Sequence, residues 1–246
     1  MRILAAVVVV AVVATVAVVL VAKKDTKSHP RTAAVQTPAV VRGGTMVVAT
    51  GSTSGVLNPA TTSNGGIHPN AEPMFNGLLA FGPNGDVVPD LAASLPVVTN
   101  NADGTQDAVF TLRRGMTWHN GTPITNDDVV FSFTQSLLRY QSRTAASMAP
   151  ALGVTGAGNK AVTPADAITE PDAAGGLQVK FHFRYPYAPL LKQMNVTEAP
   201  IIPKRVYAHC AADGGDGTLG NQTAPFCPEN LHPIGSGPFM LSLIHI

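Results

Sequence analysis

Hydrophobic and polar residues change their spacing within the stretch 108–138, and the change predicts a strand followed by a helix. Residues 109–113 alternate apolar with polar side chains and are rich in β-branched and aromatic types, which indicates a strand with one buried face. Further on, apolar residues recur at spacings of three and four up to about Tyr140, which is typical of a helix with one apolar face. Asn120-Gly121, a strong turn signal, separates the two elements.

The helix is predicted to begin at Asn126. Thr125 and Asp128 have the spacing of a capping box with Asp in place of Glu. Asp127 adds negative charge in the first turn, where the helix dipole is positive. His119 is close to both aspartates in sequence, and the three could be combined into a metal or acid–base site. Because both aspartates already have a role at the helix start, we interpret this group as structural rather than catalytic.

Four other segments have a pattern that predicts local structure. Short strands over 79–81 and 86–88 flank a Gly-Pro-Asn-Gly turn and predict a hairpin. Residues 177–183 alternate cleanly and predict a strand. A helix is predicted over 71–78, with its apolar residues on one side. The stretch 142–176 is rich in Ala, Gly and Pro and only weakly periodic, so we expect mostly irregular structure there.

The N-terminal segment 1–22 is predicted to be a signal peptide or a transmembrane anchor. Ile3 to Ala22 is a run of twenty uncharged residues, which as a helix would reach roughly 30 Å and cross a bilayer core. We favour an uncleaved anchor, because the run is longer than a usual signal-peptide core and lacks a good small-x-small cleavage site. Residues 23–43 have the composition of a linker. Either interpretation places the protein outside the cytoplasm.

Charge and cysteine content restrict the possible functions further. A formal net charge of +1 gives no electrostatic case for binding nucleic acid. Cys210 and Cys227 are the only cysteines, and an even pair in an exported chain predicts a disulfide that closes the Gly- and Asp-rich loop between them. Two independent thiols or half of a metal site are the alternatives, but a structural zinc site needs four ligands. We predict no cofactor and no metal.

The glycine-containing loop 51–55, Gly-Ser-Thr-Ser-Gly, differs from two motifs found in esterases and nucleotide-binding proteins. Its central residue is Thr53, where the nucleophile elbow of an esterase has Ser. It also lacks the lysine of a phosphate-binding P-loop. Neither an esterase nor a nucleotide-binding protein is therefore indicated by this loop.

Several short blocks follow one another in an order that resembles a known family. They include Phe110-Thr111-Leu112-Arg113, Trp118-His119-Asn120-Gly121-Thr122-Pro123, Asp127-Asp128-Val129-Val130-Phe131-Ser132, Tyr185-Pro186-Tyr187, Ile202-Pro203-Lys204 and Gly235-Ser236-Gly237-Pro238-Phe239. Through these blocks the chain resembles the bacterial extracellular solute-binding proteins of the peptide/nickel group, family 5. These are the binding components of ABC importers for oligopeptides, dipeptides, nickel chelates and some oligosaccharides. The resemblance covers roughly residues 44–240.

The resemblance implies an α/β fold of the two-lobed type II-like periplasmic-binding-protein class. Residues 44–70 and 186–240 would form parts of one large lobe, and 71–185 would form a smaller lobe inserted between them. We expect the chain to stop before the second ligand-binding lobe. The last six residues, 241–246, match one reading frame of an adapter used in sequencing libraries, so we expect a non-native tail there.

The resemblance also implies a ligand-binding segment and a function without catalysis. The segment near the cleft would offer backbone groups to an extended peptide, and its glycines would permit close approach. Its predicted ligand-binding residues are Asn64, Gly65, Gly66, Ile67 and His68. The expected partners are a peptide or other small solute, an ABC permease, and the membrane through residues 3–22. An exported hydrolase and a purely structural anchored domain are the competing interpretations.

Overall fold

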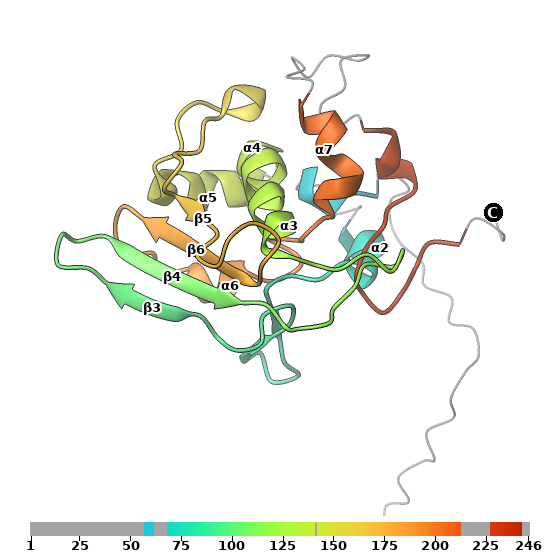
Figure 1. Ribbon diagram of the computed structural model, residues 1–246, viewed down its shortest axis with the longest axis horizontal. Helices are drawn as coiled ribbons and strands as arrows, with labels where there is room; N and C mark the ends of the chain where they lie inside the picture. The colour runs from blue at the N-terminus through green and yellow to red at the C-terminus, as the bar shows by residue number, and fades with distance from the viewer. Residues whose placement is uncertain (1–56, 62–67, 141, 213–226, 243–246) are drawn as a thin grey trace, which may run out of the picture. The chain divides into compact units, whose positions relative to one another are not determined.

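A four-stranded antiparallel sheet forms the framework of the residues that the computed structural model describes (Figure 1). Those residues are 57–61, 68–140, 142–212 and 227–242, and they belong to one compact unit, 48–246. The strand order in the sheet is β3-β4-β6-β5. The strands are β3 (Val97–Asn100), β4 (Gln106–Thr111), β5 (Ile168–Thr169) and β6 (Gln178–Phe183). The predicted strands over 109–113 and 177–183 are thus confirmed, each with slightly shifted ends.

Alternation along the two central strands builds the core on one face of this sheet. In the register of β4 and β6, Phe110 is opposite Val179 and Ala108 is opposite Phe181, and all four side chains are buried. Phe133, in the helical segment that starts at Asn126, packs edge-on against Phe181 with ring centroids 4.9 Å apart. The period-two pattern therefore places the large apolar groups where two helices, α3 (Asn126–Phe131) and α5 (Ser142–Leu152), contact β6.

The helical segment starts and continues as the sequence predicts. Helix α3 (Asn126–Phe131) begins with a Thr125–Asp128 capping box. A π-helical turn, η3 (Ser132–Leu137), and the short α4 (Leu138–Tyr140) carry the segment to Tyr140. The Ser132 hydroxyl at the start of the π-helical turn donates to the Asp128 carbonyl at 2.6 Å and accepts from the backbone N–H of Ile202 at 2.9 Å. A tertiary contact thus accompanies this irregularity, which the periodicity alone did not predict.

The prediction of a helix over 71–78 is wrong in its bounds, because the helical turns begin earlier and end before Phe75. Helix α2 (His68–Ala71) and the 3-10 turn η2 (Glu72–Met74) end at Phe75, whose backbone is extended. The next residues are held by partners remote in sequence, since Asn76 pairs with Ile201 in a β-bridge. A Cβ on Gly77 would lie only 2.6 Å from backbone atoms of Met194 and Asn195, so the chain is in direct backbone contact there. These tertiary contacts override the local apolar spacing.

The expectation of irregular structure over 142–176 is also wrong in part, because α5 (Ser142–Leu152) is an eleven-residue helix. Its composition is mainly small residues, so its apolar face is inconspicuous in the sequence. The face is nevertheless at helical spacing. Its fully buried residues are Thr144, Met148, Ala151 and Leu152.

A small two-stranded sheet and several short helices complete the described structure. Strands β1 (Leu79–Phe81) and β2 (Val87–Pro89) form the predicted hairpin, with a positive φ of 81° at Gly85 in the turn. The short helices are η1 (Pro59–Thr61), η4 (Gly158–Lys160), α6 (Leu190–Gln193), α7 (Lys204–Ala212) and η6 (Pro228–Leu231). Within the ranges described, no helix combines the length and apolar content needed to cross a bilayer. The predicted signal or anchor 1–22 and the linker 23–43 lie outside the described residues.

Candidate functional site

His119 joins the turn after β4 to the segment 233–239. Its backbone N–H donates to the carbonyl of Gly235 at 2.8 Å. Its Nδ1 accepts from the N–H of Gly235 at 3.2 Å, and its Nε2 lies 2.8 Å from the carbonyl oxygen of Gly237. Because Nδ1 is the acceptor, the proton belongs on Nε2, which donates to Gly237. Both ring nitrogens are therefore occupied by backbone groups.

The two glycines in this arrangement are required by close backbone approach. The N–H of Gly237 donates to the Met74 carbonyl at 2.9 Å. A Cβ on Gly235 would lie 1.7 Å from the Met74 carbonyl oxygen, and one on Gly237 would lie 2.5 Å from that of Pro73. The Gly-Ser-Gly-Pro block and the Trp-His-Asn-Gly block of the sequence thus meet at one place, which we call the His119 clasp: His119, Gly235 and Gly237 with the backbone of Pro73 and Met74.

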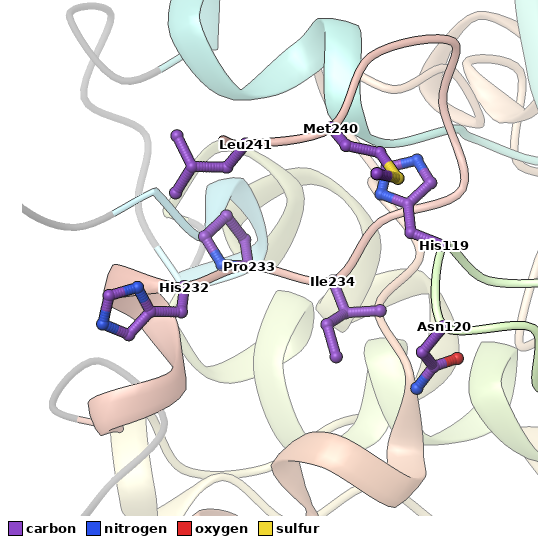
Figure 2. Close-up of a pocket in the computed structure, with 7 residues that line it drawn as sticks. All are labelled: His119, Asn120, His232, Pro233, Ile234, Met240 and Leu241. Carbon is purple, nitrogen blue, oxygen red and sulfur yellow. The ribbon is translucent and has the colours of Figure 1, made fainter. Parts of the chain in front are cut away.

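A pocket of about 260 Å³ opens beside the His119 clasp (Figure 2). Figure 2 shows the Met240 side chain next to the His119 ring. The Asn120 side-chain oxygen accepts from the backbone and hydroxyl of Thr122, at 3.1 and 2.7 Å, so it does not face a ligand freely. The pocket is suited to apolar groups more than to acid–base chemistry. Its lining residues are His119, Asn120, His232, Pro233, Ile234, Met240 and Leu241.

Asp128 connects the start of α3 to the start of α7. Its Oδ2 accepts from the indole N–H of Trp118 at 3.2 Å and from the backbone N–H of Thr125 at 3.0 Å, and its Oδ1 accepts from the backbone N–H of Lys204 at 2.8 Å. Burial raises the pKa of the Asp128 carboxyl, while these hydrogen bonds act in the opposite direction. Trp118 is itself 2 % exposed, which fits a packing role and not a ligand platform.

The structure does not bring His119, Asp127 and Asp128 together as a catalytic group. Asp127 forms an ion pair with the Lys204 side chain at 2.8 Å, and the other two residues have the backbone and indole partners described above. A second pocket, of about 370 Å³, lies beside both aspartates. Each of the three side chains is already engaged in holding two segments together.

The predicted ligand-binding segment falls largely outside the described residues. Asn64, Gly65, Gly66 and Ile67 are not described. His68 is the first residue of α2, and its side chain is also outside the description. Their role in binding stays a prediction.

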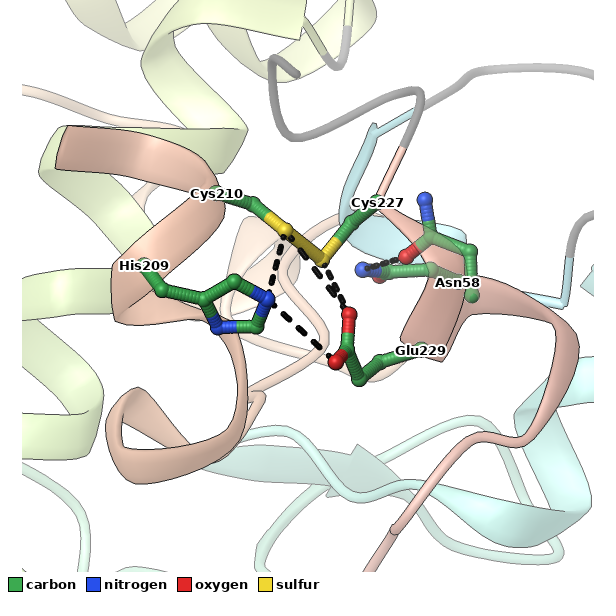
Figure 3. The surroundings of a disulfide bond; sticks show 6 residues. Asn58, His209, Cys210, Cys227 and Glu229 are labelled. Atoms are coloured by element: carbon green, nitrogen blue, oxygen red, sulfur yellow. Dashed lines mark hydrogen bonds and ion pairs between the residues drawn. A yellow bond between two sulfur atoms is a disulfide. The ribbon is translucent and has the colours of Figure 1, made fainter. Parts of the chain in front are cut away.

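Cys210 and Cys227 are bonded in the structure, with Cα atoms 5.7 Å apart (Figure 3). Two further groups with metal-binding chemistry lie against the sulfurs. His209 Nε2 is 3.2 Å from Cys210 Sγ, and a Glu229 carboxylate oxygen is 2.8 Å from Cys227 Sγ. Sequence reasoning missed Glu229, although the adjacent pair His209-Cys210 and the short spacing between Cys227 and Glu229 were visible in the sequence.

Comparison with known proteins identifies the family of this chain. The sequence model described as bacterial extracellular solute-binding proteins, family 5 Middle, matches residues 86–244. The protein XP55 of Streptomyces lividans is 31 % identical over 169 residues, which are 69 % of this chain and 25 % of that protein. The probable D,D-dipeptide-binding periplasmic protein DdpA of Escherichia coli K12 is 30 % identical over 190 residues, which are 75 % of this chain and 31 % of that protein.

A solved structure agrees with this result. The periplasmic oligopeptide-binding protein of an oligopeptide ABC transporter from Thermotoga maritima has a TM-score of 0.51 and 26 % identity, covering 76 % of this chain and 29 % of that one. The chain therefore spans about a quarter to a third of the length of these relatives. The resemblance and the α/β fold class predicted from the sequence are confirmed.

Proposed function

The chain belongs to the bacterial extracellular solute-binding proteins of family 5, and on that premise we propose that it serves outside the cytoplasm as the substrate-binding component of an ABC importer. Its substrates are peptides or related small solutes, and its membrane partner is an ABC permease. The family match over 86–244 carries this proposal. The names of two relatives, a dipeptide-binding and an oligopeptide-binding protein, support the substrate class. Residues 3–22 anchor it to the membrane or direct its export.

The described contacts support placing 44–70 and 186–240 in one lobe. The backbone N–H of Leu57 donates to the Asn230 carbonyl at 2.8 Å, and the side-chain amide of Asn58 donates to that of Asn230 at 2.9 Å. Asn58 and Asn230 are both fully buried, so this pairing is part of the core. The first and the returning segments of the proposed large lobe are therefore linked directly.

Several contacts join the inserted segment 71–185 to the proposed large lobe. The His119 clasp crosses between 71–185 and 186–240, as do the Asn76–Ile201 bridge and the Asp128–Lys204 hydrogen bond. Such contacts favour the two segments moving as one body. Closure around a ligand, the usual action of two-lobed binding proteins, then involves a lobe formed by the part of the relatives' length that this chain does not span.

Ligand capture in this account relies on backbone pairing by residues 64–68. An extended peptide adds as a strand, and main-chain hydrogen bonds supply affinity that is independent of the peptide's side chains. We expect Gly66→Pro, which removes a backbone donor, to weaken peptide binding about tenfold or more in a form of the protein that reaches the length of its relatives. Gly66→Ala keeps the N–H and separately tests whether the peptide approaches so closely that a Cβ is not tolerated. An affinity of Gly66→Pro equal to that of the parent protein would rule out pairing at Gly66.

An exported hydrolase is the competing function, and turnover separates the two. The described side chains near the pockets form no nucleophile and base pair, since His119 is bonded to Gly235 and Gly237 and the aspartates are bonded as above. In a form of the protein that reaches the length of its relatives, a screen with ester and peptide substrates should show no turnover, while a peptide ligand should raise the melting temperature. Steady hydrolysis at a rate proportional to protein concentration would favour the hydrolase.

A further inference from the structure

His209, Cys210, Cys227 and Glu229 form a cluster that the proposed transport function does not use (Figure 3). His209 and Cys210 come from the last turns of α7, and Cys227 and Glu229 come from the start of η6. One ligand atom from each of the four residues lies within 4.8 Å of every other. Two thiol sulfurs, one imidazole nitrogen and one carboxylate oxygen are a donor set that Zn²⁺ accepts.

We propose that the Cys210–Cys227 pair is a redox-controlled zinc site, in which the reduced pair binds one Zn²⁺ together with His209 and Glu229. A dithiol reductant cleaves the S–S bond by giving two electrons and two protons, and is itself oxidised to a disulfide. Zn²⁺ then replaces the two thiol protons, which are released to water, and forms two Zn–thiolate bonds. In the oxidised form the sulfurs are bonded to each other and the site does not hold the ion.

Three of the distances between ligand atoms are already close to the spacing around a tetrahedral ion, and those that involve Cys227 Sγ are shorter. Zinc–ligand bonds of about 2.0–2.3 Å place neighbouring tetrahedral ligand atoms roughly 3.3–3.8 Å apart. His209 Nε2 lies 3.3 Å from Glu229 Oε1 and 3.2 Å from Cys210 Sγ, and Cys210 Sγ lies 3.7 Å from Glu229 Oε2. Cys227 Sγ lies 2.8 Å from Glu229 Oε2, so this sulfur has to move away from the carboxylate as well as from Cys210. Cleavage of the S–S bond frees the sulfurs to move apart, which is the main change that the ion requires.

Burial and charge favour the same ion. The two cysteines are 1 % and 3 % exposed, so the thiolates would be shielded on one side. The His209 and Glu229 side chains are 52 % and 34 % exposed, which leaves an entry route from solvent. Bonded sulfurs carry no proton, so the Glu229 oxygen at 2.8 Å from Cys227 Sγ receives no hydrogen bond there. After reduction, Zn²⁺ between the thiolates and this carboxylate would neutralise their negative charges.

The test uses the untagged 246-residue chain, with and without reduction by a phosphine that does not bind zinc. Alkylation and mass spectrometry count the free thiols, and a chromophoric chelator competes for Zn²⁺. We expect one tightly bound Zn²⁺ per reduced chain and none per oxidised chain. With Co²⁺ as the probe, the reduced chain should show thiolate-to-cobalt charge-transfer absorption. Equal zinc affinity of the oxidised and reduced chains would overturn the proposal.

Single-residue variants separate a built site from loose thiol binding. Glu229→Gln and His209→Asn leave both cysteines in place and should each weaken Zn²⁺ binding at least about tenfold, as loss of a ligand requires. His232→Asn is the matched control, because His232 lines the separate pocket of Figure 2, and it should bind zinc as the parent does. Unchanged affinity in both Glu229→Gln and His209→Asn would reduce the site to two thiols and contradict the four-ligand assignment. Circular dichroism of the reduced chain establishes that it stays folded during the titration.

Discussion

His119 and Gly237 are 118 positions apart in sequence, and the imidazole Nε2–H donates to the glycine carbonyl at 2.8 Å. The other ring nitrogen accepts from the backbone N–H of Gly235. One side chain therefore satisfies a donor and an acceptor of the same backbone segment. Histidine is often a catalytic residue, but His119 holds two distant parts of the chain together.

Replacing His119 by Ala should lower the free energy of unfolding by about 2–3 kcal/mol, because it leaves partly buried backbone groups of Gly235 and Gly237 without partners. His232→Ala is the control, since His232 is exposed, and it should change stability by about 0.5 kcal/mol or less. Urea unfolding followed by the fluorescence of Trp118 measures both. Similar urea midpoints for the two variants would contradict the clasp.

Gly235→Ala should destabilise the chain by about 3 kcal/mol, since the new Cβ would overlap a backbone atom and force the segments apart. The Cβ would lie 1.7 Å from the Met74 carbonyl oxygen. Gly82→Ala is the matched control, because its Cβ would meet only the movable side chain of Asp86, at 2.7 Å. We expect less than about 1 kcal/mol there. Thermal unfolding of both variants provides the comparison, and an equal loss in both would argue against backbone contact at Gly235.

Local features of the fold could be predicted from the sequence, and the remote ones could not. The Thr125–Asp128 cap depends on residues three positions apart, so the start of α3 was predictable. The end of the segment at Phe75 depends on the pairing of Asn76 with Ile201, which no local pattern contains. Helix α5 escaped prediction because its buried face is made partly of alanine and threonine.

The candidate sites show the same division. The family blocks pointed to a solute-binding protein, but their spacing did not reveal that His119 meets Gly235. The two cysteines were evident, whereas Glu229 joins them only through the packing of η6 against α7. A contact between residues that are distant in sequence leaves no recognisable pattern in the sequence around either residue.

Asp128→Ala should be much more damaging than Asp127→Ala. The Asp128 carboxylate accepts hydrogen bonds from Trp118, Thr125 and Lys204, and its loss leaves three donors unsatisfied. We expect a loss of about 3 kcal/mol. The Asp127 ion pair with Lys204 is partly exposed, so its removal should lower stability by about 1 kcal/mol or less. Chemical denaturation measures the difference, and a larger effect at Asp127 would reverse this account of the α3 start.

The Asp172 carboxylate should stabilise the folded chain near neutral pH, and this contribution should be lost in acid. Its carboxylate accepts from the backbone N–H of Leu177 and Gln178, and these bonds lower its pKa below the usual value. A lowered folded-state pKa contributes stability above the unfolded value of about 3.9, and that contribution is lost as the pH falls through the folded-state pKa. The stability difference between the parent and Asp172→Asn should therefore be full near pH 6 and shrink below about pH 4. A difference that stays constant or grows on acidification would exclude this linkage.

Calorimetry with pools of di-, tri- and oligopeptides tests whether this protein binds peptides. It should compare the 246-residue chain with a form of the protein that reaches the length of its relatives. Peptide affinity depends on burying the ligand between two lobes, because the entropy lost on immobilising a flexible chain must first be offset. We expect micromolar or tighter binding, without hydrolysis, for the longer form, and much weaker binding for the 246-residue chain. Absence of peptide binding by the longer form, or hydrolysis of the peptides, would contradict it.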